Sequence, residues 1–323
     1  MSVVLVMVEH DRGALVPGAL EALTFGRHLA CDLGLSLHGV TIGSSADALA
    51  KQLGHYGAEV IHQAHHEILC DYGPQAWGET VAQLARSIEA AVIITTGTDS
   101  GNEVIANAAA RMDLPMVANC TKLLPRQGLW ELVRLRWGGS LLERASLDAP
   151  VKILTLAPNR FEATLEPGAG KTESFVPTLD PCLAQTVVRR RVVESKGISL
   201  ASAPVVVSGG RGVKSAAGFA PLEELADLLG GAVGCSRVAT NNGWRPHSDQ
   251  VGQTGTRIAP QIYIACGISG AIQHWVGAMG AKHILAINTD PEANMVHKAD
   301  YAIIGDLHEI IPAIVDAVRT AQN

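Results

Sequence analysis

The sequence predicts an α/β protein made of two doubly wound domains, each built on a mostly parallel sheet. Short apolar runs alternate with segments of helical periodicity along most of the chain, a pattern typical of βαβ units. The 323 residues are more than one ordinary hydrophobic core accommodates. Residues 194–204, rich in small residues and ending in a proline, interrupt the alternation. We therefore place a first domain at residues 1–194, a linker at 195–203 and a second domain at 204–323.

The amino-acid composition limits the kinds of partner and of functional site that this chain can have. Hydrophobic residues make up 47% of the chain and charged residues 17%, as in a compact globular protein. The formal net charge of −6 argues against a large basic face, so we expect no nucleic-acid partner. The six cysteines include no Cys-x-x-Cys pair, which excludes a zinc ribbon and a dithiol redox motif.

The apolar N-terminus indicates a buried strand. It lacks the basic region of a signal peptide and is followed at once by Glu9, His10 and Asp11. No apolar stretch reaches the roughly 20 residues that cross a bilayer. We therefore expect a cytoplasmic protein with no signal or transit peptide and no direct membrane insertion.

In the first domain, apolar runs and helical patterns follow one another in order. We expect strands at residues 3–8, 35–42, 59–62, 91–96, 116–124, 129–136 and 151–156. We expect helices near residues 18–33, 45–56, 75–89 and 101–112. Residues 158–181 lack periodicity and contain closely spaced Gly and Pro, so they are predicted to form a surface excursion. An extended stretch at 186–193 is expected before the linker.

The second domain repeats the same alternation. Strands are expected at residues 205–207, 262–266, 284–287 and 301–304, and helices at 221–229 and 307–321. The last three strands are apolar on both faces, which is typical of central strands in a parallel sheet. Polar, glycine-rich loops accompany these strands, at residues 208–212, 236–237, 267–270, 288 and 305–306. Because open α/β sheets bind ligands outside the carboxyl ends of their strands, these loops predict one nucleotide site.

Generic nucleotide fingerprints do not explain this site. Residues 209–215 end in Gly-Val-Lys-Ser and so lack the Gly-Lys-Ser of a Walker A loop, and Gly210-x-Gly212 lacks the third glycine of the dinucleotide motif. A different set of motifs is present instead. They are Ser208-Gly-Gly-Arg-Gly212, Gly243-Trp244, Gln250-Val-Gly-Gln-Thr-Gly255, Ala259-Pro260, Gly267-Ile-Ser-Gly-Ala-Ile-Gln-His274, Ala286-Ile-Asn288, Asp290-Pro-Glu-Ala293 and Ala299-Asp-Tyr301.

In order and spacing these motifs resemble the electron-transfer flavoprotein alpha subunit over residues 204–318. The first domain is similar mainly in its α/β layout and its opening at residues 3–9. The resemblance implies that the second domain binds FAD and that the chain pairs with a beta subunit, which the first domain docks. It also implies an electron carrier, not an enzyme. The carrier accepts electrons from a flavin dehydrogenase, such as an acyl-CoA dehydrogenase, and passes them to a downstream acceptor.

The resemblance also implies roles for individual residues. Arg211, Ser269 and Gly270 would contact the FAD diphosphate. Asn288 and Asp306 would serve the adenosine half. The remaining expected cofactor contacts are Ser236, Arg237, Gln250, Val251, Gly252, Gln253, Thr254, Ala271, Ile272, Gln273 and His274.

Three of these residues are expected to tune the flavin. Arg237 beside the ring and His274 near its O2 edge would stabilise the negative charge added on reduction. Thr254 would hydrogen-bond flavin N5. The chain departs from the common family pattern at Gly255-Thr256-Arg257 and Arg245-Pro246-His247, which are expected to border the site.

Several alternatives stay open. The chain could be an NAD-using enzyme of the related fold with His274 as a base, or its first domain could sense a nucleotide. Asp306 could cap the final helix in place of contacting a ligand. His62, His65 and His66 cluster in sequence but lack partners at ligand spacing, so no metal site is expected.

Overall fold

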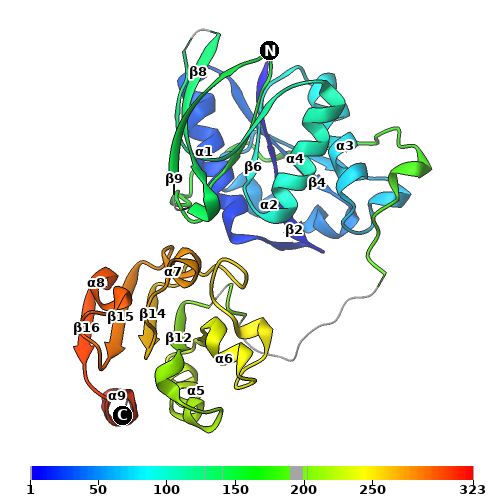
Figure 1. Cartoon of the computed structure of the whole chain (residues 1–323). Coiled ribbons are helices and arrows are strands. Elements are labelled where there is room, and N and C mark those ends of the chain that lie inside the picture. The colour runs from blue at the N-terminus through cyan, green and yellow to red at the C-terminus, as the bar shows by residue number, and fades with distance from the viewer. Residues whose placement is uncertain (1, 127, 140, 190–198, 202, 323) are drawn as a thin grey trace. The chain divides into compact units, whose positions relative to one another are not determined.

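The computed structural model describes residues 2–126, 128–139, 141–189, 199–201 and 203–322. The chain divides into two compact units, Met1–Val192 and Val193–Asn323 (Figure 1). Each unit is an α/β domain with a large parallel sheet, which confirms the predicted fold class. Most of the predicted linker lies outside the described residues, so its bounds stay a prediction.

The first unit contains a nine-stranded sheet. Across the sheet, the strands are β11 (Lys171–Phe175), β5 (Val60–Ala64), β4 (Ser36–Ile42), β1 (Val3–Met7), β6 (Ala90–Thr96), β10 (Lys152–Leu156), β7 (Met116–Leu124), β8 (Leu129–Arg136) and β9 (Leu141–Asp148). Strands β11 to β7 are parallel, whereas β8 and β9 form an antiparallel extension. A small hairpin of β2 (His10–Asp11) and β3 (Ala14–Leu15) stands apart from this sheet.

Helices cover both faces of this sheet. They are α1 (Pro17–Leu33), α2 (Ala50–Gly54), α3 (Pro74–Ser87) and α4 (Asp99–Met112). Val4 and Val6 of β1 pack in a cluster with α1 and α2, whereas Leu5 and Met7 pack in a second cluster with α3 and α4. Because both faces are covered, every residue of β1 is buried, which explains its unbroken apolar sequence.

The differences from the predicted first domain lie at the edges of the sheet. Strand β11 falls inside the predicted surface excursion and pairs with β5, and β9 was not predicted. Both strands are edge strands with many exposed polar residues, so they lack the apolar run that marks a central strand. The predicted stretch at 186–193 is not a strand at 186–189, and its later residues lie outside the described part.

The second unit contains five parallel strands in the order β13-β12-β14-β15-β16. Their bounds are β12 (Val205–Gly209), β13 (Ala232–Cys235), β14 (Ile262–Cys266), β15 (His283–Asn288) and β16 (Tyr301–Ile304). The chain leaves β12 toward β13 on one side and returns to β14 on the other. Loops from β12 and β14 therefore diverge at a topological switch point, where doubly wound sheets bind ligands.

Five α-helices complete the described part of this unit. They are α5 (Ala220–Leu228), α6 (Arg237–Asn241), α7 (Ile272–Ala278), α8 (Asn294–Lys298) and α9 (Leu307–Gln322). Leu222 of α5 and Ile311 of α9 share one core cluster with β15, whereas Ala278 of α7 and Met295 of α8 belong to a second cluster. No helix in the described residues is long and apolar enough to cross a membrane.

The prediction that β16 is a central strand was wrong. It forms the edge of the sheet beside β15, and all four of its residues are exposed, including Tyr301 at 67% and Ile304 at 51%. Its apolar sequence could not be distinguished from that of a buried strand by pattern alone. Strand β13 was not predicted, because its Ala-Val-Gly-Cys sequence is short and contains a glycine.

The neighbouring positions Ile287 and Ile303 test this placement. They are paired in register on β15 and β16, but Ile287 is fully buried and Ile303 is 37% exposed. We expect Ile287→Ala to lower the free energy of unfolding by about 2–5 kcal/mol. The matched change Ile303→Ala should cost less than about 1 kcal/mol. Urea unfolding of both variants measures the difference, and equal losses would contradict the edge position of β16.

Candidate functional site

Glycines bring the loops after β12 and β14 into direct backbone contact. Gly212 donates its N–H to the Gly267 carbonyl at 3.1 Å, and Gly210 donates to the Cys266 carbonyl at 2.8 Å. A side chain on Gly267 would start 2.7 Å from the Gly212 Cα, closer than Cβ contacts allow. The positive φ of 60° at Gly267 also favours glycine. The two loops can therefore meet only where both carry glycine.

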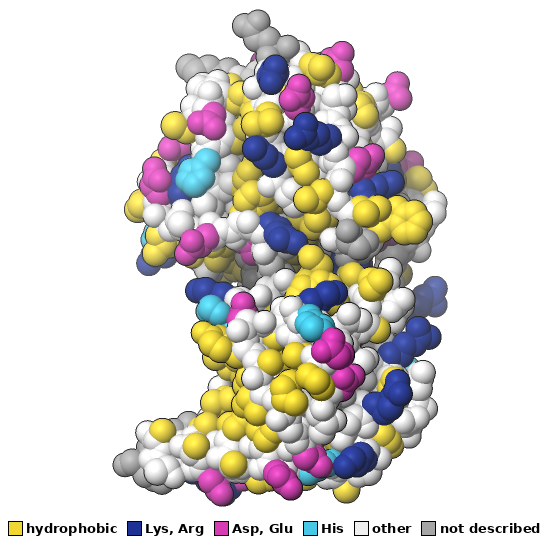
Figure 2. Space-filling view, turned by 60° about the vertical axis from the view of Figure 1, so that its left-hand side comes forward, with side chains coloured by type: hydrophobic (Ala, Val, Ile, Leu, Met, Phe, Trp, Pro, Cys, Tyr) yellow, Lys and Arg dark blue, Asp and Glu magenta, His cyan; other side chains and the backbone are white. Residues whose placement is uncertain are grey.

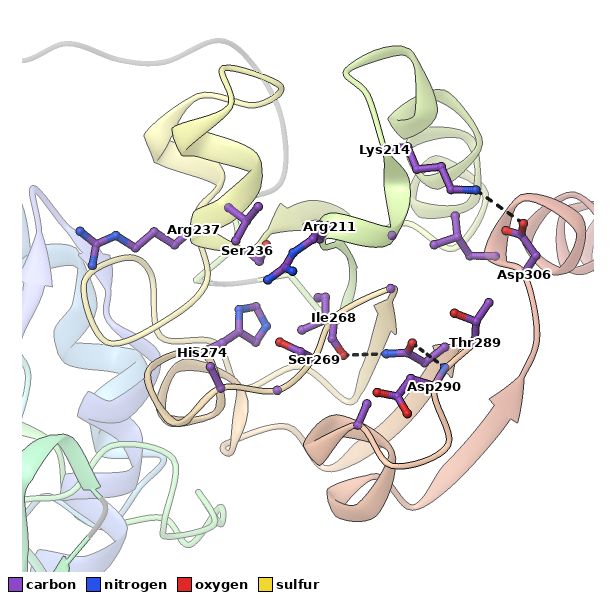
Figure 3. Close-up of a pocket in the computed structure, with 18 of the residues that line it drawn as sticks. Arg211, Lys214, Ser236, Arg237, Ile268, Ser269, His274, Thr289, Asp290 and Asp306 are labelled. Carbon is purple, nitrogen blue, oxygen red and sulfur yellow. Dashed lines mark hydrogen bonds and ion pairs between the residues drawn. The ribbon is translucent and has the colours of Figure 1, made fainter.

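A cavity of about 660 Å³ opens at this end of the sheet (Figure 3). Its volume is within the usual range for cofactor sites. The lining residues all belong to the second unit. They are Arg211, Gly212, Lys214, Ser236, Arg237, Val238, Gly267, Ile268, Ser269, Gly270, Ala271, Gln273, His274, Asn288, Thr289, Asp290, Ala293, Gly305, Asp306 and Leu307.

One side of the cavity is suited to an anion. The Arg211 side chain extends from the β12 loop toward Ser269 and His274 (Figure 3). Ser269, Gly270 and Ala271 line the same cavity, and their N–H groups donate to no other described residue. A guanidinium and free backbone donors together form a binding site for phosphate oxygens.

Gly270 positions these backbone donors. Its φ is +78°, and a Cβ there would lie 2.4 Å from the Met295 N atom at the start of α8. The Ser236 hydroxyl, at the opposite wall, is buried and has no hydrogen-bond partner among the described residues. A buried unpaired hydroxyl beside a cavity is a further donor available to a ligand.

The far end of the cavity is closed by residues after β15 and β16. Asn288 donates from Nδ2 to the Ile268 carbonyl at 3.1 Å and accepts at Oδ1 from the Asp290 N–H at 3.1 Å, so its side chain ties two loops together. Asp306 accepts from the His308 N–H at 3.0 Å and lies 3.8 Å from the Lys214 ammonium (Figure 3). The hydrogen bond from the His308 N–H is the main cause that lowers the Asp306 pKa. Asp306 thus caps α9 and lines the cavity.

His274 lies in the first turn of α7 and is 7% exposed. Its Nε2 is 2.6 Å from the hydroxyl of the fully buried Tyr263. Burial lowers the pKa of His274 to about 4 from an ordinary value of 6.5. The ring is therefore neutral at pH 7 in this structure. A neutral imidazole offers a hydrogen bond to a ligand without carrying a positive charge.

The loop at residues 250–256 lies behind α7. The Gln253 N–H donates to the Gln273 carbonyl at 2.7 Å, and the Val251 N–H donates to the Cys235 carbonyl at 2.9 Å. A Cβ on Gly277 of α7 would lie 2.3 Å from the Gly252 Cα, so the loop and the helix touch backbone to backbone. Two glycines in contact therefore fix the position of this loop.

Most of the predicted cofactor residues line the cavity. They are Arg211, Ser236, Arg237, Ser269, Gly270, Ala271, Gln273, His274, Asn288 and Asp306. The structure does not place the others in its lining: Gln250, Val251, Gly252, Gln253, Thr254 and Ile272. Val251 is buried in a core cluster, whereas the Ile272 side chain is 64% exposed.

Arg237 lines the cavity at the start of α6. Its side chain is exposed, and the guanidinium points away from His274 and Arg211 (Figure 3). The family departures at 245–247 and 255–257 are outside the cavity lining. Arg245 turns toward α5 instead, where it pairs with Glu223 and donates from Nε to Asp249 at 2.8 Å.

Sequence reasoning missed part of the cavity lining. The lining residues outside the loops predicted to form the site are Lys214, Val238, Thr289, Asp290, Ala293 and Leu307. Gly212, Gly267, Ile268 and Gly305 lie within those loops but were not named as cofactor contacts. Each residue outside the loops lies within a few positions of one of them, so a longer segment at each loop would have included it. A left-handed turn with φ of 68° at Lys214 brings its side chain toward Asp306.

The histidine cluster of the first unit forms a different arrangement. His62 Nε2 lies 3.0 Å from His38 Nδ1 on the adjacent strand, and burial lowers the pKa of His62 to about 4. His65 contacts Asp47 at 2.8 Å. Among the described residues, no group of three or more His, Cys, Asp or Glu side chains is placed to hold a metal ion.

Comparison with known proteins places this geometry in a family. Residues 199–279 match the electron transfer flavoprotein FAD-binding domain, and residues 4–180 match the electron transfer flavoprotein domain. The alpha subunit of the electron transfer flavoprotein from Thermoanaerobacterium thermosaccharolyticum is 33% identical over 97% of both chains. This chain belongs to the electron-transfer flavoprotein alpha-subunit family.

Other members of the family are similarly close. The Bacillus subtilis alpha subunit is 34% identical over 98% of this chain and 97% of its own length. The acryloyl-CoA reductase electron transfer subunit beta of Anaerotignum propionicum is 31% identical over 98% of this chain and 96% of its own length. As an electron-transfer flavoprotein alpha chain, the protein has an FAD-binding second domain and an electron-transfer role, which confirms the predicted family and cofactor.

The residues of the cavity fit FAD. The Arg211 guanidinium and the free backbone N–H groups line one cavity, and both are suited to the oxygens of a diphosphate. The glycines let such a ligand approach the backbone closely. When bound, FAD supplies the redox chemistry, since its ring accepts and releases electrons. The protein binds and orients the cofactor and sets the charge around it.

The lowered pKa of His274 predicts a pH dependence. A histidine whose folded pKa is below 6.5 contributes stability that is complete above pH 6.5 and is lost as the pH falls toward 4. We expect the His274 contribution to the free energy of unfolding to fall by at most about 1.4 kcal/mol per pH unit in that window. Urea unfolding between pH 7 and pH 4 measures the slope.

Two variants isolate the His274 contribution to that slope. His274→Asn should have a shallower slope than the unmodified chain, whereas His283→Asn, at an exposed position on β15, should keep it. An unchanged slope in His274→Asn would contradict the assignment.

Proposed function

We propose that this chain is the alpha subunit of a heterodimeric electron-transfer flavoprotein, with FAD held by residues 204–323. The observation that carries the proposal is the cavity at the β12 and β14 loops, where Arg211 faces the free N–H groups of Ser269 and Gly270. In this proposal the chain accepts electrons from a flavin dehydrogenase, such as an acyl-CoA dehydrogenase, and passes them to a further acceptor.

The geometry supports a division of FAD between two places. The diphosphate and adenosine would occupy the cavity, with Arg211 and Ser269 on the phosphates and Asn288 and Asp306 near the adenosine. The flavin ring would lie beyond the cavity, against the exposed tip of the loop at Gln253 and Thr254. This arrangement accounts for the absence of that loop from the cavity lining.

Pairing with a beta subunit is supported by the surface of the first unit. Several large apolar side chains near the β8–β9 turn are exposed, among them Trp137 at 78%, Leu142 at 69% and Leu141 at 54%. Figure 2 shows hydrophobic and basic side chains side by side over this unit, in the upper part of the view. Such mixed apolar and basic faces suit a protein interface. We assign the first domain, residues 1–194, as the scaffold that docks the beta subunit.

An acyl-CoA dehydrogenase is the favoured type of electron donor. One relative carries the name acryloyl-CoA reductase electron transfer subunit. The alternative, an NAD-using enzyme with His274 as a base, is disfavoured by the site. A buried imidazole with a pKa near 4 is a weak base at neutral pH, and its Nε2 is already bonded to Tyr263.

The proposal predicts a coloured protein. The chain co-expressed with its beta subunit should purify with the absorption spectrum of bound FAD. An acyl-CoA dehydrogenase loaded with substrate should reduce that flavin faster than NADH does, and stopped-flow absorbance measures both rates.

Arg211→Ala should weaken FAD binding roughly ten- to hundredfold, because it removes a charged partner of the diphosphate.

Lys282→Ala is the matched control, since Lys282 is an exposed cation at the opposite end of the sheet. It should leave FAD affinity unchanged. Colourless heterodimer that cannot be reconstituted with FAD would refute the proposed function, and faster reduction by NADH would refute the proposed donor.

Arg237 provides a test of the redox end of the site. Its charge is expected to favour the reduced flavin, so Arg237→Ala should make one-electron reduction roughly tenfold less favourable, a drop of about 59 mV. Arg237→Lys keeps the charge and should retain most of the potential. Spectroelectrochemical titration of the FAD-loaded heterodimer gives the three values, and equal potentials would show that Arg237 stays turned away from the flavin.

A further inference from the structure

The side chain of Gln250 is a buried amide held between two threonine hydroxyls. It is 4% exposed. Its Oε1 lies 3.0 Å from Thr240 Oγ1 on α6, and its Nε2 lies 3.0 Å from Thr254 Oγ1 on the exposed loop. The amide therefore connects a buried hydroxyl in the domain core with an exposed hydroxyl at the surface of the site.

Thr240 has two acceptors for one proton. Its Oγ1 is 3.0 Å from Gln250 Oε1 and 2.9 Å from the Arg237 carbonyl. A hydroxyl carries a single hydrogen, so only one of these two oxygens receives it at a time. This choice determines which way round the Gln250 amide lies.

Two hydrogen-bonded arrangements result. In the first, Thr240 donates to Gln250 Oε1, and the Gln250 amide donates to Thr254, whose own proton is free to point outward. In the second, Thr240 donates to the Arg237 carbonyl, and the amide is rotated by half a turn. Its NH₂ group then donates to Thr240, and its oxygen accepts the proton of Thr254, which presents a lone pair outward. The positions of the heavy atoms differ only by exchange of the amide O and N.

The backbone of the loop stays fixed in both arrangements. The Thr256 N–H donates to the Gln250 carbonyl at 2.7 Å, and the Gln253 N–H donates to the Gln273 carbonyl at 2.7 Å. A Cβ on Gly255 would lie 2.2 Å from the Gln250 carbonyl oxygen, so the loop closes tightly on Gln250. Rotation of the amide therefore changes the polarity of Thr254 without moving the loop.

We propose that Gln250 is a positioning residue that sets whether the Thr254 hydroxyl offers a proton or a lone pair to the flavin. The inference rests on the proposed function, in which Thr254 faces flavin N5. N5 accepts a hydrogen bond in the oxidised ring. A fully reduced flavin, formed with two electrons from the electron donor and one proton from solvent at N5, would donate a hydrogen bond there, which a Thr254 lone pair would accept. The rotating amide lets Thr254 match both redox states.

A double-mutant cycle in the FAD-loaded heterodimer tests this role. The carboxylate in Gln250→Glu accepts from both hydroxyls, so Thr254 can offer only a lone pair to N5. The added negative charge acts in the same way whether or not residue 254 has a hydroxyl. We therefore compare Gln250→Glu with and without Thr254→Val by the two-electron midpoint potential.

Gln250→Glu shifts the midpoint potential by one amount when Thr254 is present and by another in the Thr254→Val background, and the difference between these two shifts reports the effect of the hydroxyl alone. We expect this difference to favour the reduced flavin roughly tenfold, or about 30 mV for a two-electron couple. The neutral variant Gln250→Met, which serves if Gln250→Glu does not fold, should shift the potential only when Thr254 is present. Gln261→Glu makes the same change at an exposed position before β14 and should give no Thr254-dependent difference.

Equal shifts with and without Thr254→Val, within about twofold or 9 mV, would overturn the inference. Circular dichroism confirms that each variant is folded. If the unmodified heterodimer binds no FAD, the proposed function itself fails. If it binds FAD and the shifts are equal, the function stands and only the role of Gln250 is refuted.

Discussion

Backbone contact between glycines is the constraint on which the second domain depends. At the switch point, Gly212 and Gly267 approach so closely that a side chain on either would displace both loops. Behind α7, Gly252 and Gly277 meet in the same way. These contacts replace side-chain packing with backbone surface, which leaves N–H groups exposed to the cavity. The site is therefore polar because its walls are main chain, and its shape is rigid because the two pairs of backbones cannot separate without opening the loops. The conformational freedom that glycine loses on folding is the cost of this arrangement.

Polar side chains then serve two purposes at once. Asn288 joins the β14 and β15 loops, and Asp306 caps α9, yet both line the cavity. His274 is held in place by Tyr263 and kept neutral by burial. In each case the interaction that fixes the side chain also determines which atom it presents to a ligand. Arg211 and Arg237 are different, because both are exposed and the heads of neither make an ion pair within the described part of the chain.

The central strands and the loops that form the site could be predicted from sequence, because parallel sheets impose simple rules on residue type. A strand covered on both faces is mostly apolar, so β1, β6 and β14 stand out, and the polar residues that follow such strands gather at one edge of the sheet. The same rules fail at sheet edges. β11 and β9 are half polar, and β16 is apolar but exposed. Within the site, motifs predicted which loops meet. They did not indicate that Gln250 and Val251 are buried behind α7, since burial of a loop residue depends on contacts between segments far apart in sequence.

The exposed edge at β16 bears on how the protein exists in solution. Tyr301, Ile303 and Ile304 combine high strand propensity with apolar side chains, and the outer edge of the strand carries N–H and C=O groups that no described strand pairs. Asp300 and Asp306 flank this segment at its two ends, and acidic residues in such positions act as gatekeepers against pairing with other chains. The Asp300 carboxylate also accepts a hydrogen bond from the Ile284 N–H at the start of the neighbouring strand β15. Pairing of another strand with this edge would bring that strand against these two carboxylates, which oppose association between copies of this domain.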